Sequence, residues 1–183
     1  MFEISFRGMT EGDLPLVAAW LREEHVQRWW RDPSAADNVE SEYLPRINGI
    51  EPTEMLIVLR DGTEIGMIQR YRMSDHPDWE LSLACTGVTF MVAAGIDYVI
   101  GVRDLVGRGI GSVVVAAFSA EVFARYPEVD QIVVTPQVAN RASCRVLEKA
   151  GYLLTWTGML DSDDPSDSGT AALYVLDRSP LDS

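Results

Sequence analysis

Polar and apolar side chains alternate along this chain with two periods, one typical of strands and one typical of helices. In residues 4–9 they alternate one by one, which predicts a first β-strand. Residues 10–13 read Thr-Glu-Gly-Asp, the pattern of a helix-capping box. In residues 14–21 the apolar positions fall three and four apart, which predicts a helix with one apolar face.

A second helix and a hairpin are expected next. Asp32-Pro33 is typical of a helix start, and the helix should end at Tyr43-Leu44 because Pro45 cannot donate a backbone hydrogen bond. Two apolar stretches, residues 54–60 and 63–71, are joined by the dipeptide Asp-Gly. That combination predicts two antiparallel strands with a tight turn.

The middle of the chain gives a weaker pattern. Residues 79–83 fit a short strand or a turn, and residues 87–102 are rich in strand-forming side chains. The isolated Gly95 within that stretch predicts a β-bulge. Beyond it, the expected elements are helices at 109–125 and 140–149 and strands at 130–135, 152–158 and 170–176.

The order of these elements restricts the fold. It is neither a regular alternation of strands and helices nor a run of strands alone. We therefore expect an α/β (α+β) fold, a mixed sheet with helices on both faces. The length of 183 residues, with no internal repeat and no linker, predicts one domain over residues 1–183.

Three glycines at alternate positions, Gly107, Gly109 and Gly111, join the last of the central strands to a helix. Without β-carbons, the backbone amides there can converge on a ligand, and the helix N-terminus adds positive potential. A pyrophosphate fits such a loop. A Walker loop is excluded because no Lys precedes Ser112, and a dinucleotide fold needs an acidic residue at the next strand end, where none stands. A plain glycine-rich turn stays an open alternative.

Composition limits the partners. The net charge of −13 argues against nucleic acid and anionic membranes, and it suits a cationic substrate or simply keeps the protein in solution. Two cysteines and two histidines without ligand spacing predict no metal site. No apolar stretch is long enough to span a membrane, and no signal peptide is seen, so we expect a cytoplasmic monomer or homodimer.

The glycine-rich loop, Gly107-Arg-Gly-Ile-Gly111, resembles the acetyl-CoA pyrophosphate loop of the GNAT superfamily of N-acetyltransferases. The sequence Asn140-Arg-Ala-Ser-Cys-Arg-Val-Leu-Glu-Lys-Ala-Gly-Tyr152 resembles the later signature of that family. The resemblance covers nearly the whole chain. It implies the GNAT fold with splayed central strands and acetyl-CoA as cosubstrate. The acetyl-CoA-binding residues that it implies are Val99, Ile100, Val102, Gly107, Arg108, Gly109, Ile110, Gly111, Ser112, Asn140 and Ser143.

Four shorter sequences, at residues 25–30, 42–45, 95–97 and 147–151, resemble the aminoglycoside 6′-N-acetyltransferases. This resemblance implies direct transfer of the acetyl group to a 6′-amine within a ternary complex. It implies that Asp97 contacts the amine and accepts its proton, directly or through water, and makes it the candidate catalytic residue. The candidate substrate-binding residues are Trp29, Trp30, Tyr43, Asp78, Trp79 and Asp97.

Three positions depart from the patterns of these families. Thr135, just before Pro136, stands where the aminoglycoside enzymes carry an acidic residue. Val106 stands where Gln or Arg usually precedes the loop, and Leu147 stands where a Tyr is thought to protonate the leaving thiolate. Cys144, Ser143 or water would have to replace that Tyr, or the thiolate leaves unassisted. Two rival functions therefore stay open. One is acetylation of another amine, on a siderophore precursor, a polyamine or a protein N-terminus. The other is a non-catalytic protein that binds acyl-CoA or an aminoglycoside.

Overall fold

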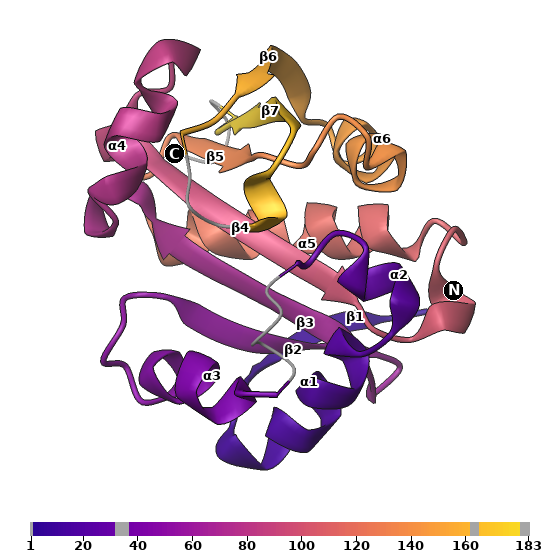
Figure 1. Ribbon diagram of the computed structural model, residues 1–183. Helices are drawn as coiled ribbons and strands as arrows, with labels where there is room; N and C mark the ends of the chain where they lie inside the picture. Colours follow the sequence, from indigo (N-terminus) through magenta and orange to yellow (C-terminus); the bar gives the residue numbers. More distant parts are fainter. Residues whose placement is uncertain (1, 32–36, 162–164, 180–183) are drawn as a thin grey trace. The chain divides into compact units, whose positions relative to one another are not determined.

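The computed structural model describes residues 2–31, 37–161 and 165–179. Its strands form a seven-stranded mixed sheet in the order β1-β2-β3-β4-β5-β7-β6 (Figure 1). The predicted α/β fold with a mixed sheet is confirmed. The chain divides into two compact units, residues 1–70 with 97–110 and residues 71–96 with 111–183. Strands β3 and β4 each contribute residues to both units.

The described part of the first unit contains a three-stranded antiparallel arrangement and three α-helices. Its elements are β1 (Ile4–Gly8), α1 (Leu14–Leu21), α2 (Glu24–Gln27), α3 (Val39–Ile47), β2 (Glu54–Arg60), β3 (Thr63–Arg72) up to residue 70, and the end of β4 (Ala93–Ile100). The predicted hairpin is confirmed, and its turn needs the positive φ of Asp61 (50°) and Gly62 (79°).

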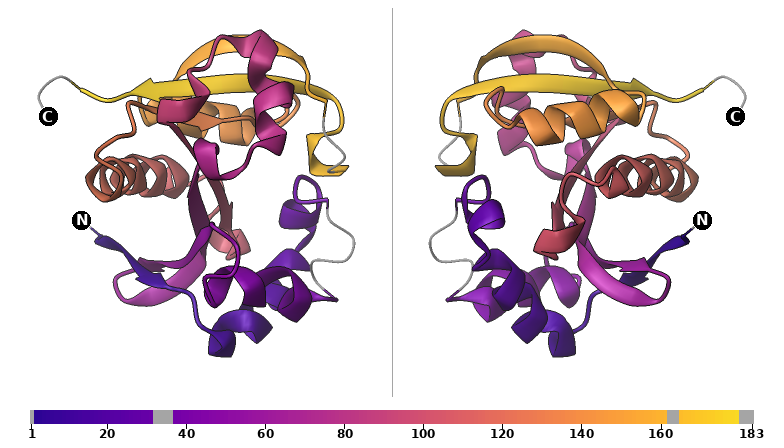
Figure 2. Two further views of the ribbon diagram at one scale, coloured as in Figure 1. Left: turned by 90° about the vertical axis from the view of Figure 1, so that its left-hand side faces the viewer. Right: turned by 90° about the vertical axis from the view of Figure 1, so that its right-hand side faces the viewer.

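The core of this unit lies between its helices and one face of its strands. Alternate side chains of β2, Met55 and Ile57, join Met67 of β3 in packing against Trp20 of α1 and Tyr43 of α3. The predicted apolar stripe of residues 14–21 supplies the helix side of this core. Helices α1 and α3 thus cover one face of β2 and β3 (Figure 2).

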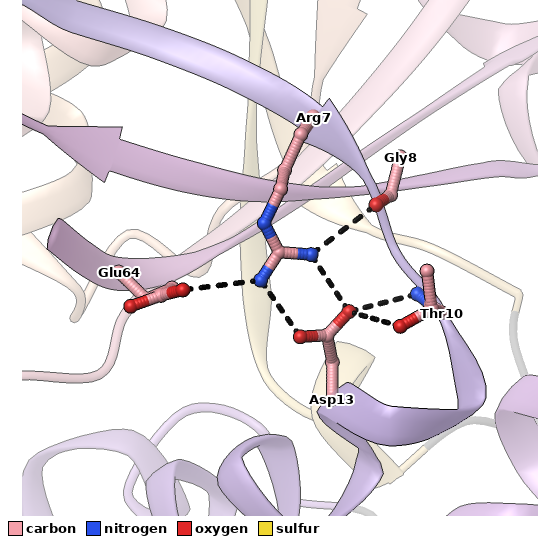
Figure 3. Close-up of polar contacts among 5 residues, drawn as sticks. All are labelled: Arg7, Gly8, Thr10, Asp13 and Glu64. Carbon is pink, nitrogen blue, oxygen red and sulfur yellow. Dashed lines mark hydrogen bonds and ion pairs between the residues drawn. The ribbon is translucent and has the colours of Figure 1, made fainter. Parts of the chain in front are cut away.

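The capping box predicted at the start of α1 is present and is tied to β1 (Figure 3). Arg7 donates two hydrogen bonds to the Asp13 carboxylate, at 2.7 and 2.8 Å. The backbone N–H and hydroxyl of Thr10 donate to the same carboxylate at 2.8 and 2.9 Å. Arg7 also donates to Glu64 on β3, at 3.3 Å. The strand end and the helix start are therefore fixed by one buried carboxylate.

Helix α3 corrects one prediction. Pro45 does not end the helix, which continues to Ile47. The expected N-cap, Asp32-Pro33, lies outside the described residues. The turn around Pro45 is held by the Glu42–Arg46 ion pair at 2.6 Å and by Leu44 and Ile47 packing against the core. One local ion pair and the packing against the core thus outweigh the hydrogen bond that proline removes.

The second unit contains the remaining strands and helices. Its elements are the end of β3, α4 (Asp78–Leu83), the start of β4, most of α5 (Ile110–Arg125), β5 (Gln131–Val134), α6 (Arg141–Lys149), β6 (Leu153–Met159) and β7 (Thr170–Asp177). Strand β4 is parallel to β5, whereas β7 is antiparallel to both β5 and β6. Except for α4 and the start of β4, these elements fall within a few residues of the predicted ones.

Side chains of β7 point alternately to two helices of this unit. Leu173 and Val175 join the apolar cluster that contains Leu83 of α4, whereas the Tyr174 hydroxyl donates to Glu148 of α6 at 3.0 Å. Helices α4 and α6 accordingly lie on opposite sides of β6 and β7 (Figure 2). The prediction of helices on both faces of a sheet therefore holds within this unit.

Two local predictions are wrong here. Residues 79–83 belong to helix α4, because Leu83 and Trp79 pack into the apolar cluster on one helical face. The strand predicted from residue 87 begins only at Ala93. The pairing of β4 with β5 is unbroken from residue 93 to 95 and ends at Gly95, so the bulge predicted there stays a prediction. A β-carbon at Gly95 would lie 2.4 Å from the Tyr71 ring, so glycine permits close packing.

Helix α5 departs from its prediction at one position. The apolar spacing of residues 109–125 predicts that Val113 faces inward, but Val113 is 43 % exposed, and Val115 is fully buried instead. Gly151 follows α6 with a φ of 95°, the left-handed conformation that glycine commonly adopts just past the end of a helix. Within the described part of the chain, no helix has the length and apolar character needed to cross a membrane.

Candidate active site

The glycine-rich loop between β4 and α5 has the backbone that the sequence predicts. Gly107 and Gly109 adopt positive φ angles of 76° and 79°. A β-carbon built at either glycine would meet no described atom within 4 Å, so these glycines serve backbone conformation and leave the surface open. Arg108 between them is exposed, and α5 begins directly after them at Ile110.

Gly111 has a different role from the other two glycines. It lies in the first turn of α5, where a β-carbon would approach Val146 of α6 to 3.0 Å. The glycine therefore lets two helices of the second unit pack closely. Ser112, next to it, is half-buried. The loop thus combines open backbone at two glycines with close helix packing at the third.

The end of β4 is firmly held within the first unit. Val99 is buried in the core, and Ile100 offers its carbonyl to Nε2 of His25 at 2.9 Å. The amides of Gly101 and Val102 both donate to the Ile65 carbonyl, at 2.9 and 3.3 Å. The Val102 amide thus already has a protein partner. Contacts of this strand end with acetyl-CoA stay a prediction.

Asn140 and Ser143 form the start of α6 in the second unit. The Asn140 side chain accepts a hydrogen bond from the Ser143 amide at 3.2 Å, so Asn140 is the predicted N-cap. Both side chains are half-buried. Their observed contact fixes the helix start, and their contact with acetyl-CoA stays a prediction.

Asp97 lies on β4, half-buried, next to an unpredicted partner. Nε2 of Gln69 on β3 donates to Oδ2 of Asp97 at 2.8 Å. Sequence reasoning missed Gln69 because no motif near it in the sequence marks it as a functional residue. Its signal is positional: it follows the core residue Met67 by two and therefore shares its strand face.

Arg46 extends this pair into a network. Its guanidinium donates to Glu42 at 2.6 Å, to Glu51 at 3.1 Å and to Oε1 of Gln69 at 3.5 Å. It also lies over the Tyr43 ring, 5.5 Å from the centroid. Burial acts to lower the pKa of Arg46, but the two carboxylates outweigh burial and raise it overall. Arg46 therefore stays charged.

The predicted aromatic residues of the first unit differ in exposure. Trp29 and Trp30 follow α2 and are half-buried. Arg28 lies over Trp29 at 5.0 Å, and Trp30 packs against the core. Tyr43 is only 1 % exposed. This burial weighs against Tyr43 as a substrate contact, which stays a prediction.

The other two predicted substrate residues belong to the second unit. Asp78 and Trp79 begin α4 and do not lie in a loop or strand. Asp78 is exposed, whereas Trp79 is half-buried and packs against the apolar cluster of this unit. Their helical setting gives each a defined place, and a role in substrate binding stays a prediction.

Comparison with known proteins identifies the family. Residues 9–157 match the family described as Acetyltransferase (GNAT) domain. The chain belongs to the GNAT acetyltransferase family. The expected enzyme class, an acetyl-CoA-dependent N-acetyltransferase, is confirmed with it.

Relatives of this GNAT chain include aminoglycoside N(6′)-acetyltransferase type 1 from Klebsiella pneumoniae. It is 31 % identical over 154 residues, which are 81 % of this chain and 73 % of the relative. A relative of the same description from Serratia marcescens matches equally. A crystal structure of aminoglycoside acetyltransferase AAC(6′)-Ib with coenzyme A and kanamycin has a TM-score of 0.80 at 29 % identity, covering 96 % of this chain and 95 % of that one.

In this GNAT chain, a core residue occupies the position at which the family pattern has a Tyr. Leu147 on α6 is fully buried. Near it in sequence, Cys144 is a buried free thiol whose Sγ lies 3.8 Å from the Gln137 carbonyl. Burial, Glu148 and Cys144 raise the pKa of Tyr174, which opposes its ionisation. Leu147 itself cannot donate a proton to a leaving thiolate.

A metal has no evident place in this GNAT site. Among the described residues, no three His, Cys, Asp or Glu side chains are grouped so that they could hold an ion.

Proposed function

We propose that this GNAT protein transfers the acetyl group of acetyl-CoA to the 6′-amine of an aminoglycoside. The observation that carries the proposal is the Asp97 carboxylate, fixed on β4 by Gln69 at 2.8 Å. The relatives support it, because those of 29–31 % identity are named aminoglycoside acetyltransferases. The net charge of −13 also favours a polycationic acceptor.

The reaction needs the protein mainly to orient the amine against the thioester and to supply one proton acceptor. A thioester already carries a good leaving group, so placing the amine against its carbonyl supplies much of the rate. The amine attacks only when neutral, and Asp97 takes its proton directly or through one water. The carbon–nitrogen bond forms as the carbon–sulfur bond breaks, and the thiolate then gains a proton from solvent.

In this proposal, the loop residues bind the pyrophosphate of acetyl-CoA. Amides around Gly107 and Gly109, the Arg108 side chain and the N-terminus of α5 would hold the pyrophosphate. Val106, 44 % exposed, offers no charge there, so binding depends on the backbone and on Arg108.

A matched pair of substrates tests the proposal. Neomycin and paromomycin differ only in carrying an amine or a hydroxyl at the 6′ position. We expect release of free coenzyme A thiol with neomycin and kanamycin, and none above background with paromomycin. Equal thiol release with both antibiotics would contradict the 6′ assignment. Turnover with spermidine alone would make a polyamine the substrate, and binding without thiol release would indicate a non-catalytic protein.

The remaining expectations belong to the same proposal. We propose that both units act as one acetyltransferase domain over residues 1–183, because the family match runs through both without interruption. We also propose a cytoplasmic monomer or homodimer without nucleic-acid or membrane partners. The buried free thiol of Cys144 and the acidic composition support that assignment.

A further inference from the structure

Gln69 and Asp97 lie next to each other on one face of neighbouring strands. Side chains two residues apart on a strand share a face, so Gln69 lies on the face of Met67 and Asp97 on the face of Val99. Met67 and Val99 both belong to the core that α1 and α3 cover. The polar pair therefore continues the core face of the first unit, where packing restricts its movement.

The Gln69 amide has two ends of nearly equal size and opposite polarity. Its NH₂ group donates to the Asp97 carboxylate at 2.8 Å, whereas its oxygen in that place would face another oxygen that carries negative charge. An amide that turns between both orientations holds the carboxylate only part of the time. Whatever binds the far end of the amide therefore influences how firmly Gln69 holds Asp97.

Arg46 binds that far end. Nη1 of Arg46 lies 3.5 Å from Oε1 of Gln69, a long hydrogen bond that also places a positive charge beside the amide oxygen. The guanidinium is itself fixed by Glu42 at 2.6 Å and Glu51 at 3.1 Å. Its side chain is 20 % exposed and lies over the core ring of Tyr43. Arg46 cannot turn away without breaking two ion pairs.

We propose that Arg46 is a positioning residue for Asp97 and acts through the Gln69 amide. The positive charge selects the amide orientation in which NH₂ faces the carboxylate, and the carboxylate is thereby held in one orientation toward the incoming amine. The effect on turnover rests on the proposed function. The orientation of the amide does not, because it is a property of the protein alone.

The amide orientation can be measured without turnover. In ¹H–¹⁵N spectra, the Gln69 side-chain NH₂ is assigned by its loss in Gln69→Leu. We expect it at a shift distinct from that of free glutamine, and we expect it to move toward the free position in Arg46→Met. Arg72→Met is the matched control, because Arg72 also joins two carboxylates, Asp75 at 2.9 Å and Glu128 at 3.4 Å, without contacting Gln69. An unchanged Gln69 signal in folded Arg46→Met would overturn the proposal.

Kinetics with neomycin give the second test. We expect Arg46→Met to lower kcat about tenfold, with the KM for acetyl-CoA unchanged, because a misplaced group costs rate. If Arg46 acts through the amide, adding Arg46→Met to Gln69→Leu lowers kcat no further. Arg46→Lys, which keeps the charge, should restore part of the rate. Losses that multiply in the double variant would instead indicate a separate structural role of Arg46.

The two tests separate two kinds of failure. If the wild-type protein acetylates no aminoglycoside, the proposed function is wrong, while the spectra still decide the role of Arg46. If Arg46→Met does not fold, the comparison of wild type with Arg46→Lys decides it. The lysine amine donates without the planar fork of arginine, so a shift of the Gln69 signal is expected there as well.

Discussion

The Asp13 carboxylate joins the end of β1 to the start of α1, and its contacts depend on its charge. The Arg7 guanidinium, which donates to both oxygens, lowers the pKa of Asp13 from its usual 3.8 to about 2. Burial opposes this shift, and the two Thr10 donors assist it. A carboxyl whose pKa is lower in the folded state stabilises the fold above its unfolded pKa and loses that effect as the pH falls.

Asp13→Asn should therefore change the acid dependence of stability. Between about pH 5 and pH 2, we expect the free energy of unfolding of the wild type to fall by about 2 kcal/mol more than that of the variant. Urea unfolding followed by tryptophan fluorescence at several pH values measures this. Glu64→Gln is the control, because Glu64 lies farther from Arg7, is 40 % exposed and should contribute about 0.5 kcal/mol or less. Parallel acid profiles of Asp13→Asn and wild type would contradict the assignment.

At the residue scale, Asp97 is the predicted catalytic residue. Asp97→Asn keeps the size of the side chain but removes the proton acceptor, so kcat with neomycin should fall by about a hundredfold or more. The KM for acetyl-CoA should stay the same, since the change concerns the amine. Steady-state thiol release measures both quantities. A variant with wild-type kcat would remove Asp97 from the mechanism.

At the scale of secondary-structure elements, the loop between β4 and α5 is the predicted acetyl-CoA site. Gly109 has a φ of 79°, so any side chain there strains the backbone, and charge must be separated from strain. Asn tolerates this conformation better than most residues and has nearly the shape of Asp. Comparing Gly109→Asp with Gly109→Asn therefore isolates the charge.

If the loop holds the pyrophosphate, Gly109→Asp should raise the Kd of acetyl-CoA about tenfold above that of Gly109→Asn. Isothermal titration with acetyl-CoA measures the difference, and circular dichroism verifies that both variants fold. Gly62→Asp, at the same φ of 79° in the β2–β3 turn, controls for strain away from the loop. Equal Kd values for the two Gly109 variants would place the phosphates elsewhere.

Charge acts at the scale of the whole molecule. With 28 acidic and 15 basic side chains, the protein attracts polycations over distances that salt screens. We expect the KM for neomycin to rise about threefold or more between low and physiological ionic strength, with kcat unchanged. The KM for acetyl-CoA, an anion, should not rise and serves as the internal control. A KM for neomycin that does not depend on salt would mean that local contacts alone attract the substrate.

Local signals in the sequence determined much of this protein. The hairpin turn, the capping box and the glycine-rich loop were predictable because a few adjacent residues fix each backbone. The two signature motifs also determined the family. Each of these features can be recognised without knowing which residues pack against it.

Tertiary structure decided the rest. Helix α3 continues through Pro45 while Leu44 and Ile47 pack against the core, and these are contacts that local propensity does not contain. Gln69 meets Asp97 across 28 positions of sequence, and only the pairing of two strands brings them together. Arg46 reaches the same amide from a helix 23 positions away. Such contacts depend on register and packing, which no short stretch of sequence specifies.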